Sequence, residues 1–177
     1  DEIITYSFIS PTRYDKIRWP EDYQRRNSFK ILNPLGEDTS IMRTTTLPSM
    51  LEILTRNYNF RNKSAKLYEL GRVYFKPKVL TLGAYGDGMD FFALKGAVEA
   101  VLKQLRIENV RFLADSENPS YHPGRCAKVF SGDRLLGVLG QIHPHVAGNY
   151  GVDAELYAAE LRFDALYESK GSQPLYQ

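Results

Sequence analysis

The stretch Lys66-Leu-Tyr-Glu-Leu-Gly-Arg-Val-Tyr-Phe-Lys-Pro77 decides the fold of this 177-residue chain. Aromatic and aliphatic residues recur through it, which is typical of a β-strand. The residues after Pro77 are again rich in Val and Leu. The sequence therefore predicts two strands, at residues 65–75 and 78–85, joined by a tight turn at Lys76 and Pro77, most simply as a hairpin.

Two helices are clearly marked in the rest of the chain. In residues 47–59 the apolar positions fall on one helical face, with Thr46 in front and Pro48 in the first turn. Asp90 can cap a second helix, whose apolar face extends to Leu105. Further strands are expected at residues 2–8, 29–32, 110–114, 125–131, 134–142 and 155–162, and shorter helices at residues 11–17, 144–148 and 163–169. Strand hairpins with helices to the side predict an α+β fold built on an antiparallel sheet, and not a doubly wound parallel one.

Composition narrows the class of protein. A chain of this length fits one domain, and its 43% hydrophobic and 25% charged residues are ordinary globular values. Its net charge of +2, from 23 basic and 21 acidic residues, is too balanced to announce a nucleic-acid-binding surface. Cys126 is the only cysteine, which excludes an internal disulfide and a cysteine-based zinc site and fits a reducing cytoplasm. No apolar run reaches the length of a transmembrane helix, so no membrane association is expected.

Several residues could carry chemistry, but each has a simpler structural interpretation. Gly83-Ala-Tyr-Gly-Asp-Gly88 precedes a helix but matches no phosphate-binding spacing, so a plain glycine-rich turn is favoured. Asp87 and Asp90 could bind a divalent ion, although a helix cap is favoured over it. Cys126 is expected to be a small core residue and not a nucleophile.

The three histidines, His122, His143 and His145, could on paper bind a metal. Pro144 separates two of them, and no carboxylate stands at a familiar ligand spacing. We expect them instead to tie loop backbone through their ring N–H groups.

Eight phrases, in order, make the chain resemble the catalytic-like module of the β subunit of bacterial phenylalanyl-tRNA synthetases. They are Glu2-Ile-Ile-Thr-Tyr-Ser-Phe8, Asn33-Pro-Leu-Gly-Glu-Asp38, Met42-Arg-Thr44, Leu47-Pro48, Leu67-Tyr-Glu-Leu-Gly-Arg72, Asp90-Phe-Phe-Ala-Leu-Lys-Gly96, His122-Pro-Gly-Arg125 and Gly140-Gln-Ile-His-Pro144. The resemblance covers residues 2–168 and implies a class II aminoacyl-tRNA synthetase-like antiparallel sheet flanked by helices. One departure is Gln141, which stands where the family pattern has glutamate.

The same resemblance implies that catalysis has been lost. In catalytically active class II relatives this strand leads into Arg-x-Glu, whose arginine holds the ATP α-phosphate; here the two places fall on Phe75 and Pro77. A phenyl ring donates no hydrogen bond to phosphate, and proline has neither charge nor an N–H. Residues 132–168 also lack a glycine-rich segment ending in arginine. We therefore expect no catalytic, cofactor-binding or metal-binding residue in this chain, and ATP and magnesium only in the parent complex.

What remains is a scaffold that joins an α subunit. The resemblance implies a cytoplasmic heterotetramer of α and β subunits that ligates phenylalanine to its tRNA, with residues 1–170 as the catalytic-like core domain and residues 171–177 as the start of a linker. The apolar face of the 47–59 helix is expected to pack in the domain's own core. An exposed apolar patch near the N-terminal strand and residues 33–43 should face the α subunit.

Two rival hypotheses stay open at this point. The chain could be an active class II ATP-dependent ligase, or a free-standing tRNA- or peptide-binding module. Arg43, Arg72 and Arg125 bear on the second rival, because they could contact tRNA phosphates. We favour pairing of these arginines with carboxylates such as Glu37, Asp38 or Glu69, since the surrounding charge is mixed.

Overall fold

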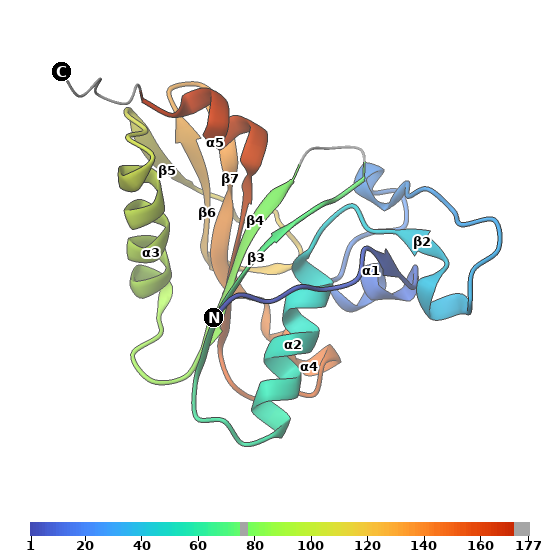
Figure 1. Cartoon of the computed structure of the whole chain (residues 1–177). Helices are drawn as coiled ribbons and strands as arrows, with labels where there is room; N and C mark the ends of the chain where they lie inside the picture. Colours follow the sequence, from blue (N-terminus) through green and yellow to red (C-terminus); the bar gives the residue numbers. More distant parts are fainter. Residues whose placement is uncertain (75–77, 172–177) are drawn as a thin grey trace.

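A six-stranded antiparallel sheet, in the order β3-β4-β8-β7-β6-β5, forms the centre of the molecule (Figure 1). The computed structural model describes residues 1–74 and 78–171. The strands of the sheet are β3 (Ala65–Gly71), β4 (Val79–Tyr85), β5 (Val110–Ala114), β6 (Tyr121–Ser131), β7 (Arg134–Ile142) and β8 (Leu156–Arg162). A separate small ribbon pairs β1 (Phe8–Ile9) with β2 (Ile41–Met42). The predicted α+β fold with an antiparallel sheet is confirmed.

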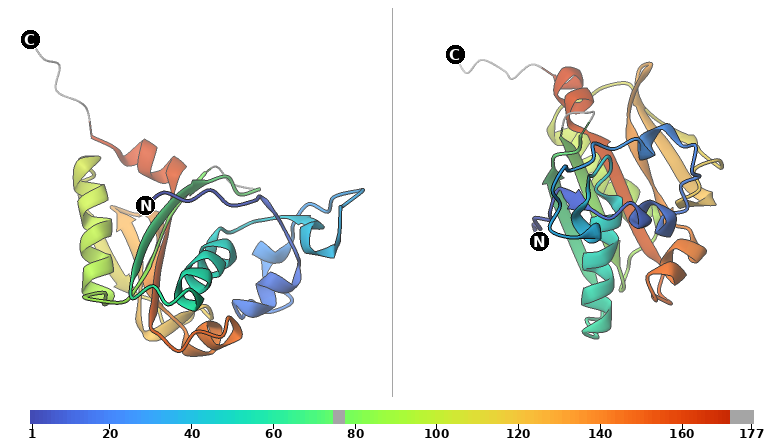
Figure 2. Two further views of the ribbon diagram at one scale, coloured as in Figure 1. Left: turned by 60° about the horizontal axis from the view of Figure 1, so that its bottom comes forward. Right: turned by 90° about the vertical axis from the view of Figure 1, so that its right-hand side faces the viewer.

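Helices cover both faces of the large sheet (Figures 1 and 2). On one face lie α1 (Thr12–Lys16), α2 (Leu47–Asn59) and α4 (Pro144–Asn149); on the other lie α3 (Phe91–Gln104) and α5 (Phe163–Ser169). Two short 3₁₀ helices, η1 (Gln24–Arg26) and η2 (Glu37–Thr39), lie between α1 and β2. Successive strand residues point to opposite faces, so β8 supplies Leu156 and Ala158 to the α2 core and Tyr157, Ala159 and Leu161 to the α3–α5 core.

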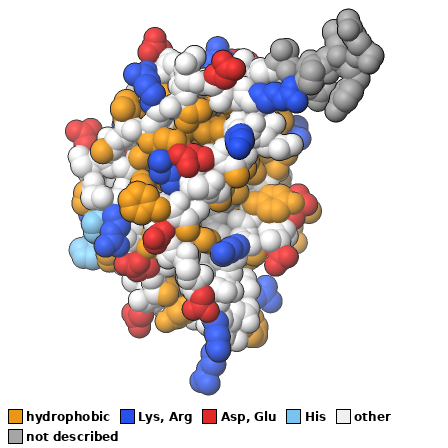
Figure 3. Space-filling view, turned by 90° about the vertical axis from the view of Figure 1, so that its left-hand side faces the viewer, with side chains coloured by type: hydrophobic (Ala, Val, Ile, Leu, Met, Phe, Trp, Pro, Cys, Tyr) orange, Lys and Arg blue, Asp and Glu red, His pale blue; other side chains and the backbone are white. Residues whose placement is uncertain are grey.

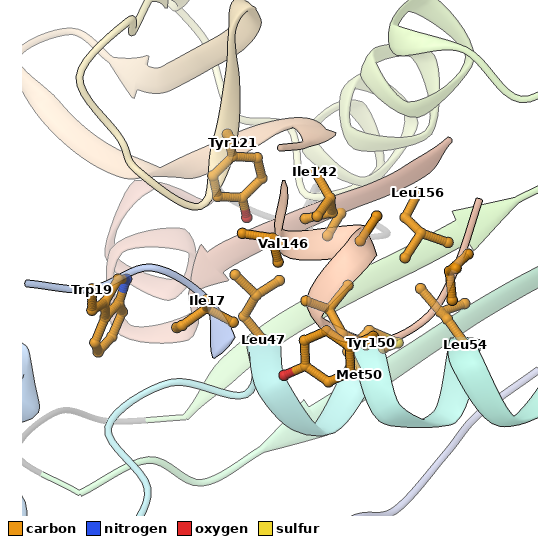
Figure 4. Packing of buried hydrophobic residues seen from close by; sticks show 14 of the residues in the cluster. Ile17, Trp19, Leu47, Met50, Leu54, Tyr121, Ile142, Val146, Tyr150 and Leu156 are labelled. Atoms are coloured by element: carbon orange, nitrogen blue, oxygen red, sulfur yellow. The ribbon is translucent and has the colours of Figure 1, made fainter. Parts of the chain in front are cut away.

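Helix α2 has the bounds that the sequence predicts, and its apolar face is fully buried. Leu47, Met50, Leu51 and Leu54 are each at most 1% exposed, and they pack among side chains from α1, α4 and the sheet (Figure 4). Gly83 on β4 allows this close approach, because a Cβ there would lie 2.5 Å from the Met50 side chain. The prediction that this face packs in the domain's own core is confirmed.

Helix α3 begins where its cap predicts. Asp90 Oδ1 accepts a hydrogen bond from the Ala93 N–H at 2.6 Å, which satisfies one of the free N–H groups of the first turn. Leu94, Val98 and Leu102 are buried against the sheet.

Two predicted strands are reduced to fragments. In residues 2–8 only Glu2 bridges Tyr68 and only Phe8 belongs to β1, because the Thr5 N–H bonds the Glu69 side chain at 3.2 Å and not a neighbouring backbone. In residues 29–32 only Lys30 forms a bridge, to Ile41. The sequence pattern therefore predicted extended backbone correctly, but it did not show whether that backbone pairs continuously with a neighbouring strand.

The predicted hairpin is correct in pairing but wrong in length. β3 and β4 pair from Ala65↔Tyr85 to Gly71↔Val79, so the connection spans residues 72–78 and is not a tight two-residue turn. The chain leaves the ladder after Gly71 because the Tyr74 N–H bonds the Arg43 carbonyl at 2.9 Å. The positions 75–77, including Phe75, Lys76 and Pro77, lie outside the described residues.

Strand β6 begins at Tyr121, four residues before its predicted start. Its pairing with β7 is irregular between Tyr121 and Cys126. Pro123 cannot donate a backbone hydrogen bond to a neighbouring strand. A proline therefore argued against a strand here, and the predicted strand began too late. None of the helices within residues 1–74 and 78–171 is long and apolar enough to span a bilayer.

Candidate functional site

The N-terminal segment turns its apolar side chains outward and its polar ones inward. Ile4 and Tyr6 are 92% and 86% exposed, and Phe8 is partly exposed, whereas Thr5 and Ser7 between them are half-buried. In a strand that packs on a core, by contrast, the apolar side chains face the core and the polar ones face water. Exposed apolar side chains of this size are candidates for an interaction site where they form a contiguous surface.

A buried ion pair explains why Thr5 faces inward. Arg43 and Glu69, whose side chains are 1% and 4% exposed, form a salt bridge of 2.9 Å. The Thr5 hydroxyl donates to the Glu69 carboxylate at 2.9 Å and the Arg43 Nη1 donates to the same hydroxyl. Arg43 Nε also donates to the Arg72 carbonyl at 3.1 Å. The N-terminal segment, the residues that lead into α2 and the end of β3 are thus joined by one buried polar network.

A second buried carboxylate holds the residues that lead into α2. Glu160 on β8 is 7% exposed and accepts hydrogen bonds from the Thr45 hydroxyl at 2.5 Å and the Thr46 N–H at 3.1 Å. The Thr46 hydroxyl also bonds the Thr81 hydroxyl of β4. Because the carboxylates of Glu69 and Glu160 are both satisfied, residues 43–46 have a fixed position on the sheet.

The segment between α1 and β2 forms an arm that projects from the sheet (Figure 2). Residues 29–31 lie beside residues 40–42. The Ile31 N–H donates to the Ser40 carbonyl, and the Met42 N–H donates to the Phe29 carbonyl, both at 2.9 Å. Leu32 and Leu35 in this arm are almost completely exposed. We call Ile4, Tyr6, Phe8, Leu32 and Leu35 the exposed apolar surface. Its members lie in the N-terminal segment and in the arm, at or next to the two regions where the sequence predicts an apolar patch.

The three arginines singled out in the sequence have different surroundings. Arg43 pairs with Glu69 as predicted. Arg125 Nη1 donates to Gln141 Oε1 at 2.6 Å and to the carboxylate of Glu155 at 3.1 Å, so it too has a carboxylate partner. Arg72 is exposed, and within the described part of the chain its side chain forms no salt bridge. Among those residues, Glu37 and Asp38 likewise form no salt bridge with any of the three arginines, which corrects the expected pairing.

A cavity of about 230 Å³ lies over the sheet on the α2 side. Its charged lining residues form three pairs: Arg162 with Asp164 at 2.9 Å, Lys128 with Asp115 at 3.3 Å and Arg25 with Glu160 at 4.0 Å. Burial alone would raise the pKa of Asp164, but the Arg162 guanidinium and backbone N–H groups outweigh it and lower that pKa. Each cation that lines the cavity therefore has a carboxylate partner.

The residues that could have formed a metal or nucleophilic site have structural roles. Gly86 and Gly88 have positive φ angles, so the glycine-rich segment is a turn, as favoured. Cys126 is buried in the α2 core, and burial raises its pKa to about 12, which leaves it a thiol. Within residues 1–74 and 78–171 no three histidine, cysteine or acidic side chains are placed to share a metal ion.

The histidine rings accept hydrogen bonds where we expected them to donate. His122 Nδ1 accepts from the Gly124 N–H at 3.0 Å, and His143 Nδ1 accepts from the His145 N–H at 3.1 Å. His143 thereby caps α4. Burial, followed by the charges of Arg18 and the other two histidines, lowers the pKa of His143 and favours this neutral acceptor form.

Two features of the site were missed in the sequence. Glu160 was not singled out, although it is an acidic residue inside the otherwise apolar strand Leu156-Tyr-Ala-Ala-Glu-Leu161, which signals a buried partner. The polar-in, apolar-out order of the N-terminal segment was also missed, because alternation alone does not say which side faces the core.

Comparison with known proteins identifies relatives over most of the chain. The family described as phenylalanyl tRNA synthetase beta chain CLM domain matches residues 1–163. The phenylalanine–tRNA ligase beta subunit of Clostridium acetobutylicum is 47% identical over 96% of this chain, and that of Clostridium tetani is 42% identical over 100% of it. The chain spans only 22% and 24% of those two relatives.

A solved structure supports the fold at much lower sequence similarity. The crystal structure of pyrrolysyl-tRNA synthetase from Desulfitobacterium hafniense superposes with a TM-score of 0.75, at 15% identity, over 94% of this chain and 61% of that one. This similarity shows that the architecture is that of a class II aminoacyl-tRNA synthetase catalytic domain.

Proposed function

Because the chain belongs to the family of phenylalanyl-tRNA synthetase beta chain CLM domains, we propose that it is a non-catalytic scaffold that binds the α subunit through its exposed apolar surface. The complex so formed ligates phenylalanine to its tRNA with ATP and magnesium in the cytoplasm. In this proposal residues 1–170 form the core domain and residues 171–177 begin a linker to a following domain.

The observation that carries the proposal is the outward orientation of the apolar side chains. Tyr6, Leu32 and Leu35 are each more than 80% exposed. The backbone next to Tyr6 is anchored through Thr5 to the buried pair of Arg43 and Glu69, and the arm is held by hydrogen bonds from Ile31 to Ser40 and from Met42 to Phe29. An apolar surface on an anchored backbone gains free energy when a partner removes it from water, and it needs little ordering on binding.

The charges over the sheet support the non-catalytic part of the proposal. The lining residues of the cavity pair with one another, and the sequence places Phe75 where active relatives have their ATP-binding arginine. These residues do not fit a bound nucleotide, so the complex's ATP site belongs to the α subunit. A free-standing tRNA-binding module is less well supported, because Arg43 and Arg125 are both engaged with carboxylates.

The proposal is tested by producing the chain together with an α subunit of the same family and measuring complex formation and charging of tRNA. We expect a stable complex, and we expect charging to need both chains. ATP and phenylalanine binding by this chain alone, measured by calorimetry, should be undetectable. Micromolar ATP binding, or failure to bind the α subunit, would contradict the proposal.

A further inference from the structure

The cavity on the α2 side of the sheet is built on three neighbouring strands. Register places Lys128 of β6 opposite Val138 of β7, and Val138 opposite Glu160 of β8, so these three lining side chains lie on one face of the sheet. Arg25, in η1, lines the cavity from the arm. The volume of about 230 Å³ is below the range of about 300–1,000 Å³ that is usual for drug-sized ligands, so a ligand that fits it is small.

Charge in this cavity is sorted by depth. The carboxylates of Asp115 and Glu160 lie deep, because their side chains are only 5% and 8% exposed. The cations that line the cavity lie nearer its mouth, with side chains 36–45% exposed; they are Arg25, Lys128 and Arg162. On the α3 side of the molecule, by contrast, apolar and charged side chains are intermixed over the surface (Figure 3).

The deep carboxylates have hydrogen-bonding capacity left. Glu160 Oε1 accepts the bonds from Thr45 and Thr46, whereas Glu160 Oε2 lies 4.0 Å from Arg25, which is beyond hydrogen-bond distance. Asp115 Oδ2 lies 3.3 Å from Lys128 Nζ, which is longer than the roughly 2.7–2.9 Å of a charge-assisted hydrogen bond. Because buried carboxylate oxygens normally have donors, the deep end of the cavity suits an ammonium group.

The mouth of the cavity suits the opposite charge. The ammonium group of Lys128 has three N–H donors and the guanidinium group of Arg25 has five, so each retains donors beyond those that face its carboxylate partner. Such donors bind a carboxylate well. Three cations and three carboxylates line the cavity, so a ligand with no net charge leaves its charge balanced.

We propose that this cavity binds a small linear zwitterion, with its ammonium group deep against Asp115 and Glu160 and its carboxylate group at the mouth beside Lys128 and Arg25. The two charged groups must stand at opposite ends of the molecule, because the cavity separates its own charges by depth. An α-amino acid carries both groups on one carbon and cannot serve both ends.

This inference is independent of the proposed contact with the α subunit. The residues of the exposed apolar surface are not among those that line the cavity. Loss of one function would therefore leave the other in place, and binding can be measured on this chain alone.

Calorimetry with a graded series of ligands tests the proposal on the wild-type chain. Unbranched ω-amino acids from glycine to 6-aminohexanoate are titrated at pH 7, beside the alkylammonium ion and the carboxylate of the same length. We expect one member of the series to bind with millimolar or tighter affinity. It should bind at least about tenfold more tightly than either singly charged analogue, which corresponds to about 1.4 kcal/mol for the lost charged group. Leucine, an α-amino acid, should bind at least about tenfold more weakly than that member.

A charge-removing variant tests which end of the cavity holds the ammonium group. Asp115 Oδ1 accepts the Glu117 N–H at 3.2 Å, and Asp115→Asn keeps an oxygen for that bond while it removes the charge. We expect this variant to bind the best ligand at least about tenfold more weakly. The matched control is Asp133→Asn, because Asp133 is fully exposed in the turn between β6 and β7 and does not line the cavity. Its affinity should equal that of the wild type.

Three results would overturn the proposal. One is the absence of binding by any member of the series at 10 mM, roughly tenfold above the weakest affinity expected. Another is equal affinity for the zwitterion and its singly charged analogues, a comparison made on the wild type that does not depend on the folding of a variant. The third is equal affinity in Asp115→Asn and Asp133→Asn.

Discussion

The apolar face of α2 and the exposed apolar surface are made of the same kinds of side chain, yet only the first is buried. Leu54 in α2 is fully buried, whereas Ile4 and Tyr6 in the N-terminal segment are 92% and 86% exposed. Both regions have fixed backbones, so the difference does not come from local order. It comes from which side of the backbone the polar anchors occupy.

The anchors fill the space that an apolar core would otherwise take. Arg43, Glu69 and Thr5 form hydrogen bonds beneath the N-terminal segment, so its apolar side chains have no room on that side. Under α2 the sheet offers Gly83 and aliphatic residues, and the helix packs down on them. The comparison indicates that the core stabilises this chain, and in our proposal the exposed apolar surface serves the contact with the α subunit.

Removing the anchor should have the largest effect. Arg43→Met leaves Glu69 as an unpaired buried carboxylate, and we expect a loss of about 3–5 kcal/mol in the free energy of unfolding, measured by urea denaturation. The double variant Arg43→Met/Glu69→Leu removes both charges and should recover most of that loss. A single variant within about 0.5 kcal/mol of the wild type would contradict the anchoring role, since that is the range of ordinary surface substitutions.

Truncating one leucine from each region sharpens the comparison. Leu54→Ala opens a cavity under α2 and should cost about 2–5 kcal/mol of stability. Leu35→Ala removes a fully exposed side chain and should change stability by no more than about 0.5 kcal/mol. The two variants are compared by urea denaturation of this chain alone. A comparable loss in both would mean that the arm packs against the domain in solution.

The packing of α2 on the sheet can also be disturbed by adding a methyl group to the core. A Cβ at Gly83 would lie 2.5 Å from the Cγ and Sδ atoms of Met50, so Gly83→Ala forces the flexible methionine to move. We expect a loss of about 1–3 kcal/mol, as for other overpacked cores. The matched control is Gly96→Ala, because a Cβ at Gly96 meets no atom within 4 Å. Gly132 is unsuitable as a control, because its positive φ of 56° would strain an alanine.

The smallest expected effect is a pH-dependent change in stability at His143, which caps α4. The pKa of His143 is lowered in the folded chain below its ordinary value of 6.5, so the unfolded chain takes up a proton first as the pH falls. Its contribution to stability is therefore present above pH 6.5 and is lost as the pH falls through the folded pKa. His143→Asn keeps a side-chain acceptor at the helix N-cap but does not titrate.

Urea denaturation of both proteins at pH 7.5 and pH 5.5 measures this contribution. The stability of the wild type should fall more over that interval than that of His143→Asn. Equal falls in the two proteins would show that the ring is not held in its neutral form.

Much of the fold could be predicted because periodicity and capping act locally. The bounds of α2 and the Asp90 cap of α3 follow from the residues themselves. The ends of strands were less predictable, because they depend on distant partners. β3 ends at Gly71 since Tyr74 bonds Arg43, a residue far away in the sequence.

The candidate site was only partly predictable for the same reason. The region of the exposed apolar surface could be predicted from the family resemblance, and so could the pairing of Arg43 with a carboxylate such as Glu69. The hydrogen bonds from Thr5 to Glu69 and from Thr45 to Glu160 could not, because these residues are separated by 64 and 115 positions. Sequence order contains no direct sign of such pairs, and burial alone distinguishes them from ordinary surface charges.

The central claim is that the exposed apolar surface binds the α subunit, and one affinity measurement tests it most directly. Leu32→Asp/Leu35→Asp is titrated against a purified α subunit, beside Phe92→Asp, which alters an exposed aromatic residue on α3. Both variants should keep wild-type stability. The account predicts that the double variant weakens binding by about 30-fold or more, the loss expected from removing about 2 kcal/mol of contact, and that Phe92→Asp does not change it. Unchanged affinity of the double variant, with the complex still formed, would contradict the account.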